Sequence, residues 1–276
     1  MKVQVLVAAV DQDPRELVHR MRLDSDALIV NQCGQYAYEQ WQEAGHTFRA
    51  FSMKERGVGL SRNTALMRAE GEICLFSDQD IVYEPDYERK ISEEFERHPE
   101  ADMLLFNIQV EASRRTYLNT GYKRVHLYNC GRYGAVSFAI RRSALRALGV
   151  TFSLLFGGGT AYSNGEDSLF LQQLIKKGCR VYTSAVVIGT EQPSESTWFS
   201  GYHEKFFFDR GVLYAFLYGG MAPLMSLRFL LAHRSLLCKE LSGREEKHCM
   251  KAGCREGRKL CRGRGLQEAE EGKGVR

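Results

Sequence analysis

The stretch Glu72-Ile73-Cys74-Leu75-Phe76-Ser77-Asp78-Gln79-Asp80-Ile81-Val82 decides how the rest of this chain is interpreted. Its apolar run, residues 73–76, predicts a buried strand. The strand ends in two carboxylates one residue apart, and both can reach a hard divalent cation if the backbone turns there. Aspartates are also common where an ordinary strand passes into a loop, and an Asp-x-Asp alone is a weak motif. The neighbouring sequence therefore has to choose between a metal site and a plain strand end.

Length, composition and charge bound the possibilities. With 276 residues of ordinary globular composition, the chain can bury a substantial core, either as one α/β domain or as one domain with an appendage. The formal net charge of +4 is uneven: residues 233–276 hold 12 Lys and Arg against 7 Asp and Glu, a net of +5, so the rest sums to −1. Because the body of the chain is not basic, we expect no nucleic-acid partner.

The eight cysteines show no disulfide framework, and Cys74 lies inside the predicted buried strand. We therefore expect reduced thiols in a cytoplasmic protein. The apolar segment 3–10 is short and runs into Asp11 without a cleavage site, so it does not predict a signal peptide. A cluster in the tail matches no standard zinc spacing, which makes a structural zinc site the minority interpretation: His248, Cys249, Cys254 and Cys261.

Strands and helices alternate through the first hundred residues. Apolar runs predict strands at 2–10, 26–30, 47–52 and 73–76, and helical patterns predict helices at 15–21, 36–43, 60–69 and 86–98. This order is typical of an α/β fold with a mostly parallel central sheet and helices on both faces. Ligands bind such sheets beyond the carboxyl ends of the strands. Val10-Asp11, Asn31-Gln32 and Asp78-Gln79-Asp80 all fall at that edge.

The second half of the chain is less regular. Strands are predicted at 102–110, 134–140 and 180–188, and helices at 142–148 and 168–177. The sequence Phe-Gly-Gly-Gly-Thr at 156–160 predicts a loop that could move over a site. It lacks the Gly-Lys-Ser/Thr of a phosphate-binding P-loop, so we do not interpret it as one.

From residue 197 the sequence becomes aromatic, and 212–232 contains one charged residue, Arg228. Gly219-Gly220 and Pro223 interrupt this stretch, which favours two packed helices lying on a membrane surface over one helix spanning a bilayer. We divide the chain into an α/β domain at 1–196, an aromatic helical extension at 197–233 that faces an acceptor or a membrane, and a basic, flexible tail at 234–276. The basic tail can hold the chain near anionic lipid, although a solvated extension explains it equally well.

Glu166 and Asp167 open the helix that follows the glycine-rich loop. Adjacent helical residues point about 100° apart, so the two carboxylates cannot play the same part. One would face the cleft, and the other would hold the helix or a neighbour. Acidic residues are favoured in the first turn of any helix, so this pair alone does not require a catalytic role.

Together these motifs resemble the family-2 glycosyltransferases, the inverting sugar-nucleotide enzymes of the Rossmann-like GT-A fold. The resemblance covers residues 3–216 and rests on three motifs in order: Arg62-Asn63 on the helix before the metal strand, Asp78-Gln79-Asp80 at its end, and Glu166-Asp167 in Gly-Glu-Asp-Ser-Leu-Phe. The stretches 54–63, 154–159 and 204–209 look like bacterial enzymes that build capsular or exopolysaccharide repeat units.

The chain departs from the family pattern at two places. The family often has an Asp-Asp-x-Ser-like turn after the second strand, where this chain has Asn31-Gln32-Cys33-Gly34, so the nucleotide base stays open. Gln79 occupies a position of the metal motif that is often acidic, while the two outer carboxylates are kept.

The resemblance implies transfer of a sugar, with inversion, from a nucleoside diphosphate to a hydroxyl of a glycan or polyprenyl-linked acceptor, at the inner face of the plasma membrane. It implies Mn²⁺ or Mg²⁺ held by Asp80, with Asp78 on the metal or on the ribose. Asp167 would be the catalytic base, with Glu166 as the alternative. The residues that it assigns to the nucleotide sugar are Ala8, Val10, Asp11, Asn31, Gln32, Arg62, Asn63, Ser77, Asp78 and Gln79.

Three residues of the aromatic segment receive weaker assignments. His203 and Lys205 could fold back on the diphosphate, or His203 could complete the metal shell. Trp198 could stack on a sugar face. For each of the three, a purely structural role is the alternative.

Two other functions stay open at this point. Haloacid-dehalogenase-like phosphatases also place an Asp-x-Asp after an apolar strand, although here three strand–helix units precede it. A non-catalytic nucleotide-sugar-binding module would keep the fold and lose the chemistry. The retained Glu166-Asp167 pair argues against that module.

Overall fold

The computed structural model describes residues 1–111, 117–192, 201–234 and 241–271, with side chains described up to residue 263. The chain divides into two compact units. The first unit comprises Met1–Leu154 and Glu166–Glu195, and the second comprises Leu155–Gly165 and Ser196–Arg276. The segment Leu155–Gly165 therefore leaves the first unit for the second, and the chain returns to the first unit at Glu166.

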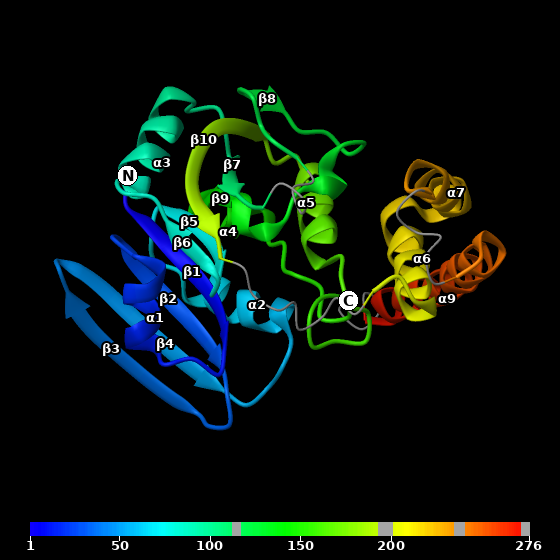
Figure 1. Ribbon diagram of the computed structural model, residues 1–276, viewed down its shortest axis with the longest axis horizontal. Coiled ribbons are helices and arrows are strands. Elements are labelled where there is room, and N and C mark those ends of the chain that lie inside the picture. The colour runs from blue at the N-terminus through cyan, green and yellow to red at the C-terminus, as the bar shows by residue number, and fades with distance from the viewer. Residues whose placement is uncertain (112–116, 193–200, 235–240, 272–276) are drawn as a thin grey trace. The chain divides into compact units, whose positions relative to one another are not determined.

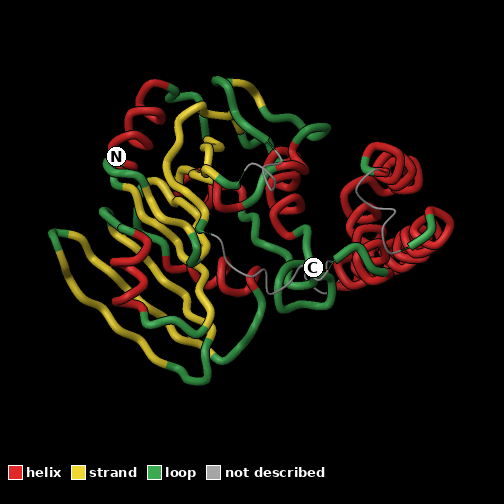
Figure 2. Tube along the Cα trace, viewed as in Figure 1, coloured by secondary structure: helices red, strands yellow, loops and turns green. Residues whose placement is uncertain are grey.

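A mixed sheet forms the centre of the first unit (Figures 1 and 2). In the described part of the chain its strand order is β3-β4-β2-β1-β5-β9-β7-β10-β6, with β8 paired to β10. The neighbours β4, β2, β1 and β5 run parallel, and β7 runs parallel to β10. The strands are β1 Val3–Val10, β2 Asp26–Gln32, β3 Ala37–Glu43, β4 His46–Met53, β5 Ile73–Asp78, β6 Ile81–Tyr83, β7 Met103–Gln109, β8 Lys123–Arg124, β9 Phe138–Arg141 and β10 Val181–Glu191.

Helices cover both faces of this sheet. Successive strand residues point to opposite sides, so the continuous apolar runs give the sheet two apolar faces to bury. Val5 and Val7 of β1 pack on one face with α1 (Pro14–Met21) and α3 (Tyr87–Arg97). Leu6 packs on the other face with α2 (Val58–Arg68), α4 (Arg142–Leu148) and α5 (Glu166–Lys176). The same alternation holds along β2 and β5. The predicted α/β class, with a largely parallel sheet and helices on both faces, is confirmed.

One predicted helix is wrong. Where a helix was predicted at 36–43, Ala37–Glu43 form the edge strand β3, which pairs antiparallel with β4 through a two-residue turn at Ala44-Gly45. Both turn residues have positive φ, 49° and 85°, which suits the right-handed twist of a tight hairpin. Gly45 therefore closes a hairpin rather than a helix. Another prediction, the strand at 134–140, is shorter as β9 and follows a 3-10 turn at Ala135–Ser137.

The second unit is helical, with α6 at Glu204–Tyr218, α7 at Ala222–Ala232 and α9 at Gly243–Glu271. By length and composition, Glu204–Ala232 is the one described stretch that could cross a membrane. It is divided by a 3-10 turn at Gly219–Met221, so the predicted pair of packed helices is confirmed. The prediction of a flexible tail is wrong for Gly243–Glu271, since this segment is a helix that buries Met250 and Cys254.

Three glycines allow α6 and α9 to pack at very short range. A Cβ added at Gly253 of α9 would lie 2.0 Å from the Phe208 carbonyl oxygen, and one at Gly257 would lie 2.7 Å from the Val212 carbonyl oxygen. A Cβ at Gly211 of α6 would lie 2.3 Å from the Met250 carbonyl oxygen. Gly253 and Gly257, in the part of the chain predicted as a flexible tail, therefore act as packing positions.

We predict that Gly253→Ala destabilises the second unit by about 1–3 kcal/mol, because the methyl group has no space beside the Phe208 carbonyl. Chemical denaturation followed by helical circular dichroism measures the change. Gly263→Ala is the matched control: it lies on the same helix with nothing within 4 Å of the added Cβ, and should stabilise by about 1 kcal/mol through helix propensity. Equal stability of Gly253→Ala and the wild type would contradict the close helix contact.

Candidate active site

Arg62 of α2 gathers three carboxylates from two other elements. One guanidinium nitrogen, Nη1, donates to Glu166 Oε1 at 2.9 Å and to Asp167 Oδ1 at 2.6 Å. The other, Nη2, donates to Asp78 Oδ1 at 3.0 Å and Oδ2 at 3.3 Å. The end of β5 and the start of α5, which the sequence analysis singled out separately, therefore meet on one side chain.

This cluster is largely removed from water. The Arg62 side chain is 4% exposed, while Glu166 and Asp167 are 10% and 23% exposed. Burial and the charge of Asp167 raise the pKa of Glu166, Arg62 lowers it, and the net pKa is about 8. Burial also acts to lower the pKa of Arg62, but the three carboxylates outweigh it, so the net pKa of Arg62 lies above its ordinary value.

The sequence around Arg62 holds it in place. Asn63 donates its amide to the Phe152 carbonyl oxygen at 2.9 Å and accepts the Phe152 backbone N–H at 2.8 Å. The Arg62 guanidinium lies over the Phe152 ring, 5.4 Å from its centroid. Gly59 permits the approach, since a Cβ there would lie 2.3 Å from the Ser153 carbonyl oxygen. In this structure Asn63 positions Phe152, and its assignment to the nucleotide sugar stays a prediction.

Asp167 is held at both carboxylate oxygens. Oδ1 accepts from Arg62, and Oδ2 accepts the backbone N–H of Ala135 at 3.0 Å. Glu166 and Asp167 thus differ as expected for adjacent helical residues: Glu166 is the more deeply buried, and Asp167 is the more accessible.

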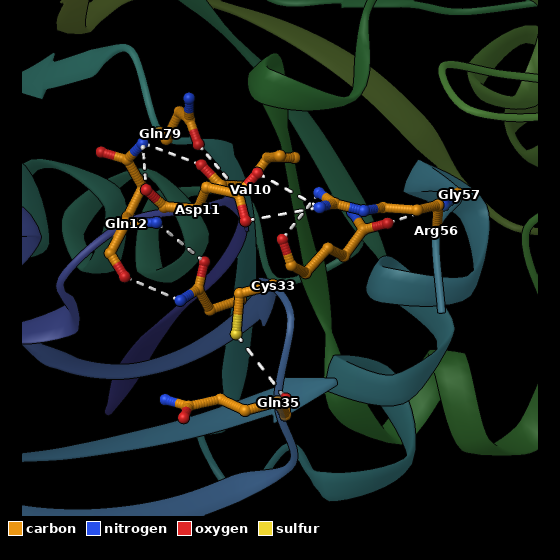
Figure 3. A network of polar contacts seen from close by, with 10 residues as sticks. Val10, Asp11, Gln12, Cys33, Gln35, Arg56, Gly57 and Gln79 are labelled. Atoms are coloured by element: carbon orange, nitrogen blue, oxygen red, sulfur yellow. Dashed lines mark hydrogen bonds and ion pairs between the residues drawn. The ribbon is translucent and has the colours of Figure 1, made fainter. Parts of the chain in front are cut away.

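The predicted nucleotide edge is a connected polar network (Figure 3). The Val10 N–H donates to Gln79 Oε1 at 2.7 Å, so the middle residue of Asp-Gln-Asp joins β5 to the end of β1. Arg56 donates to the Gln32 carbonyl oxygen at 2.8 Å and to the Asp11 carboxylate at 3.2 and 3.3 Å. Arg56 therefore brings a positive charge to this edge, which its position in the sequence did not indicate.

Several side chains at this edge are occupied by backbone groups. Asn31 accepts the Gln12 N–H and donates to the Gln12 carbonyl oxygen. Gln32 Oε1 accepts the Gly57 N–H at 2.6 Å, which fixes the start of α2. Ser77 is 1% exposed. The positions most open to a ligand are Val10 and Asp11, which are both exposed. Ala8, two residues before Val10 in β1, is half-buried.

Asp78 and Asp80 suit a hard divalent cation. Both residues are partly exposed at the end of β5, and Asp78 is paired with Arg62. In the described ranges no group of three or more His, Cys, Asp and Glu side chains is arranged to hold a metal ion, including the tail cysteines. Mg²⁺-type sites often use one or two carboxylates and complete the shell with substrate phosphates and water. The donor set therefore fits an ion that binds together with a diphosphate.

The weaker assignments in the aromatic segment fall in the second unit or outside the described residues. Trp198 lies outside them. His203 is the N-terminal cap of α6. Lys205 donates to buried Asp209 at 2.6 Å and to the Ala161 carbonyl oxygen at 3.0 Å, a structural role in that unit. Lys205 therefore anchors the segment Leu155–Gly165, and its assignment to the diphosphate stays a prediction.

The chain was compared with protein families and with known proteins. Residues 24–149 match the family model described as glycosyl transferase family 2, and this range contains Arg62, Asp78 and Asp80. This match identifies the protein as a glycosyltransferase, with the family 2 region at residues 24–149. The match favours a glycosyltransferase over the haloacid-dehalogenase-like phosphatase. No curated protein matches the chain.

Solved structures agree with a GT-A-like fold. The chain is similar to S. aureus TarS residues 1–349 in complex with UDP-GlcNAc, with 17% identity, a TM-score of 0.62, and coverage of 87% of this chain and 74% of that one. It is also similar to the mannosyltransferase PcManGT from Pyrobaculum calidifontis in complex with GDP-Man and Mn²⁺, with 13% identity, a TM-score of 0.52, and coverage of 93% and 86%. At these identities the likeness shows the fold alone.

We predict that Arg62→Met destabilises the enzyme by about 3–5 kcal/mol, because it leaves three partly or fully buried carboxylates without their cation. Arg56→Met is the matched control, since its pair with Asp11 is half exposed at both partners and should contribute at most about 1 kcal/mol. Urea denaturation of both variants measures the difference. Comparable losses in the two variants would refute the central role of Arg62.

The raised pKa of Glu166 gives a stability prediction with a definite sign. Between about pH 4.5 and 8 the folded chain keeps a proton that the unfolded chain has released, so stability from this residue falls as the pH rises through that window. Glu166→Gln removes this titration. The unfolding free energy of the wild type minus that of Glu166→Gln should therefore decrease from pH 5 to pH 8 and then level off. Parallel pH profiles would show that Glu166 titrates normally.

Proposed function

We propose that this family-2 glycosyltransferase moves a sugar from a nucleoside diphosphate to a hydroxyl of a glycan or lipid-linked acceptor, with inversion at the anomeric carbon. The observation that carries the proposal is the convergence of Asp78, Glu166 and Asp167 on Arg62. Through Arg62, the end of β5, where we expect the donor to bind, lies close to Asp167, a candidate base.

Asp167 is the better candidate for the base. At neutral pH Glu166, with its pKa raised to about 8, keeps its proton and cannot accept another. Asp167 is the more exposed of the two and is oriented by Arg62 and by the Ala135 N–H. In the transfer, the acceptor oxygen bonds to the anomeric carbon, the bond from that carbon to the diphosphate oxygen breaks, and the acceptor proton passes to Asp167.

Mn²⁺ or Mg²⁺ held by Asp80, with Asp78 on the ion or on the ribose, would offset the charge that grows on the leaving diphosphate. The donor set of the site fits such an ion, and PcManGT has been solved with GDP-Man and Mn²⁺. Arg56 at the nucleotide edge adds a second positive charge near the expected position of the phosphates.

The acceptor and pathway are proposed on sequence motifs. The stretches 54–63, 154–159 and 204–209 favour assembly of a capsular or exopolysaccharide repeat unit on the cytoplasmic side of the plasma membrane. Within the second unit, Asp209 of the third stretch accepts the Ser163 N–H at 3.0 Å and its hydroxyl at 2.9 Å, which ties the segment Leu155–Gly165 to α6.

A donor screen with three variants tests the proposal. A thermal-shift screen of sugar nucleotides, with and without Mn²⁺, identifies the donor. Donor turnover is then compared at pH 7. We expect Asp167→Asn to lose about 10²–10⁴ in kcat while donor binding persists, because the base is removed. Asp80→Asn should lose about 100-fold or more and require more Mn²⁺.

Glu166→Gln is the control for Asp167→Asn, because a neutral amide resembles the protonated Glu166 of the wild type; we expect its kcat at pH 7 to stay within about tenfold of wild type. A large loss in Glu166→Gln with an active Asp167→Asn would move the base to Glu166. Tight donor binding without transfer or hydrolysis in the wild type would indicate a non-catalytic binding module.

A further inference from the structure

The helix α7 exposes a row of large apolar side chains. Leu224, Leu227 and Leu231 are 61%, 42% and 64% exposed, and Met221, just before the helix, is 60% exposed. The three leucines are spaced by three and four residues, so they lie within about 60° of one another around the helix. We call them the apolar stripe. The buried side of α7, with Ala222 and Ser226, points elsewhere.

The helix α9 exposes a row of basic side chains with the same periodicity. All of them are exposed, and at 3.6 residues per turn they fall within about 80° of one another. We call this set the basic face: Arg244, Lys247, Lys251, Arg255 and Arg262. The acidic residues of this part of α9 lie outside that sector, with Glu246 buried and Glu256 paired to Lys259.

The two rows belong to neighbouring helices of one unit (Figure 1). Cys254 of α9 contacts α7, with its Sγ 3.4 Å from the Ser226 Oγ. On the α9 wheel Cys254 borders the basic face, whereas Gly253 and Gly257, which contact α6, lie farther from it. The basic face is therefore on the side of α9 that borders α7.

We propose that the apolar stripe and the basic face dock the C-terminal unit on an anionic phospholipid surface, with α7 at the level of the headgroups. Exposed leucines next to a row of lysines and arginines match the two attractions that hold interfacial helices, apolar burial and anionic lipid charge. The docking is independent of the proposed transfer reaction, and a vesicle assay without donor or acceptor separates the two.

Other occupants fit these two rows less well. A two-fold dimer through α7 would bring the two basic faces of the copies toward one another. A nucleic acid would pair with the basic face but leave the apolar stripe unexplained. At 11 and 15 residues, α7 and α6 are each shorter than the roughly 20 residues that a bilayer-spanning helix needs.

Flotation of the full chain with vesicles tests the proposal. We expect binding to phosphatidylcholine vesicles containing phosphatidylglycerol, weaker binding in high salt, and little binding to pure phosphatidylcholine. Lys251→Glu with Arg255→Glu, and separately Leu224→Gln with Leu231→Gln, should each weaken binding by about tenfold or more. Because these side chains are exposed, unfolding temperatures should stay unchanged.

Matched variants of the first unit serve as controls. Lys123→Glu with Arg146→Glu makes the same charge change, and Met67→Gln with Leu118→Gln removes two equally exposed apolar residues. Binding that the control pairs reduce equally would overturn the proposal, as would binding independent of anionic lipid or absent altogether. A dimer in solution that dissociates on Leu224→Gln with Leu231→Gln, or RNA binding without vesicle binding, would also overturn it.

Discussion

A buried guanidinium that faces three carboxylates is the interaction on which this active site depends. If all four groups were ionised, the cluster would carry a net charge of −2 in a region with little water, where unpaired charge is costly. The raised pKa of Glu166 relieves part of that cost by keeping one proton. Arg62 stays protonated, because its carboxylates hold its pKa above the ordinary value. The site is therefore negative before any donor arrives, and a diphosphate needs added positive charge to bind there.

Amide side chains provide the framework around this charge. Asn63 fixes Phe152 below Arg62, Gln32 fixes Gly57 at the start of α2, and Gln79 fixes the end of β1. Neutral amides can bind backbone N–H and C=O groups without adding charge. This explains why Gln79 suits the middle of the metal motif: a carboxylate there would accept the same Val10 N–H but would add to an already negative site.

The sequence predicted what depends on local pattern and strand order. The alternation along β1, β2 and β5 follows from their apolar runs, and the parallel order brings Val10, Asn31 and Asp78 to one edge. The sequence could not predict that Arg62 binds Glu166, 104 residues away, because no local pattern encodes the pairing. It also mistook β3 for a helix, since residues 36–43 are polar and aromatic and the deciding feature is the Ala44-Gly45 turn. The packing role of Gly253 and Gly257 could not be predicted either, because it depends on α6 lying against α9.

The chain passes from the second unit into the first directly before Glu166 and Asp167. Residues Leu155–Gly165 belong to the second unit, where Phe156 is fully buried, Lys205 and Asp209 hold the segment, and Leu213 fills the space beside Gly165. The next residue, Glu166, belongs to the first unit and begins α5. Gly165 has a φ of +117°, which a residue with a side chain rarely adopts, so the turn into α5 requires glycine. Within the first unit, Arg62 holds both acids at the start of α5, and the Ala135 N–H holds Asp167 as well. These different partners, together with the deeper burial of Glu166, give two adjacent acids in a helix's first turn different surroundings.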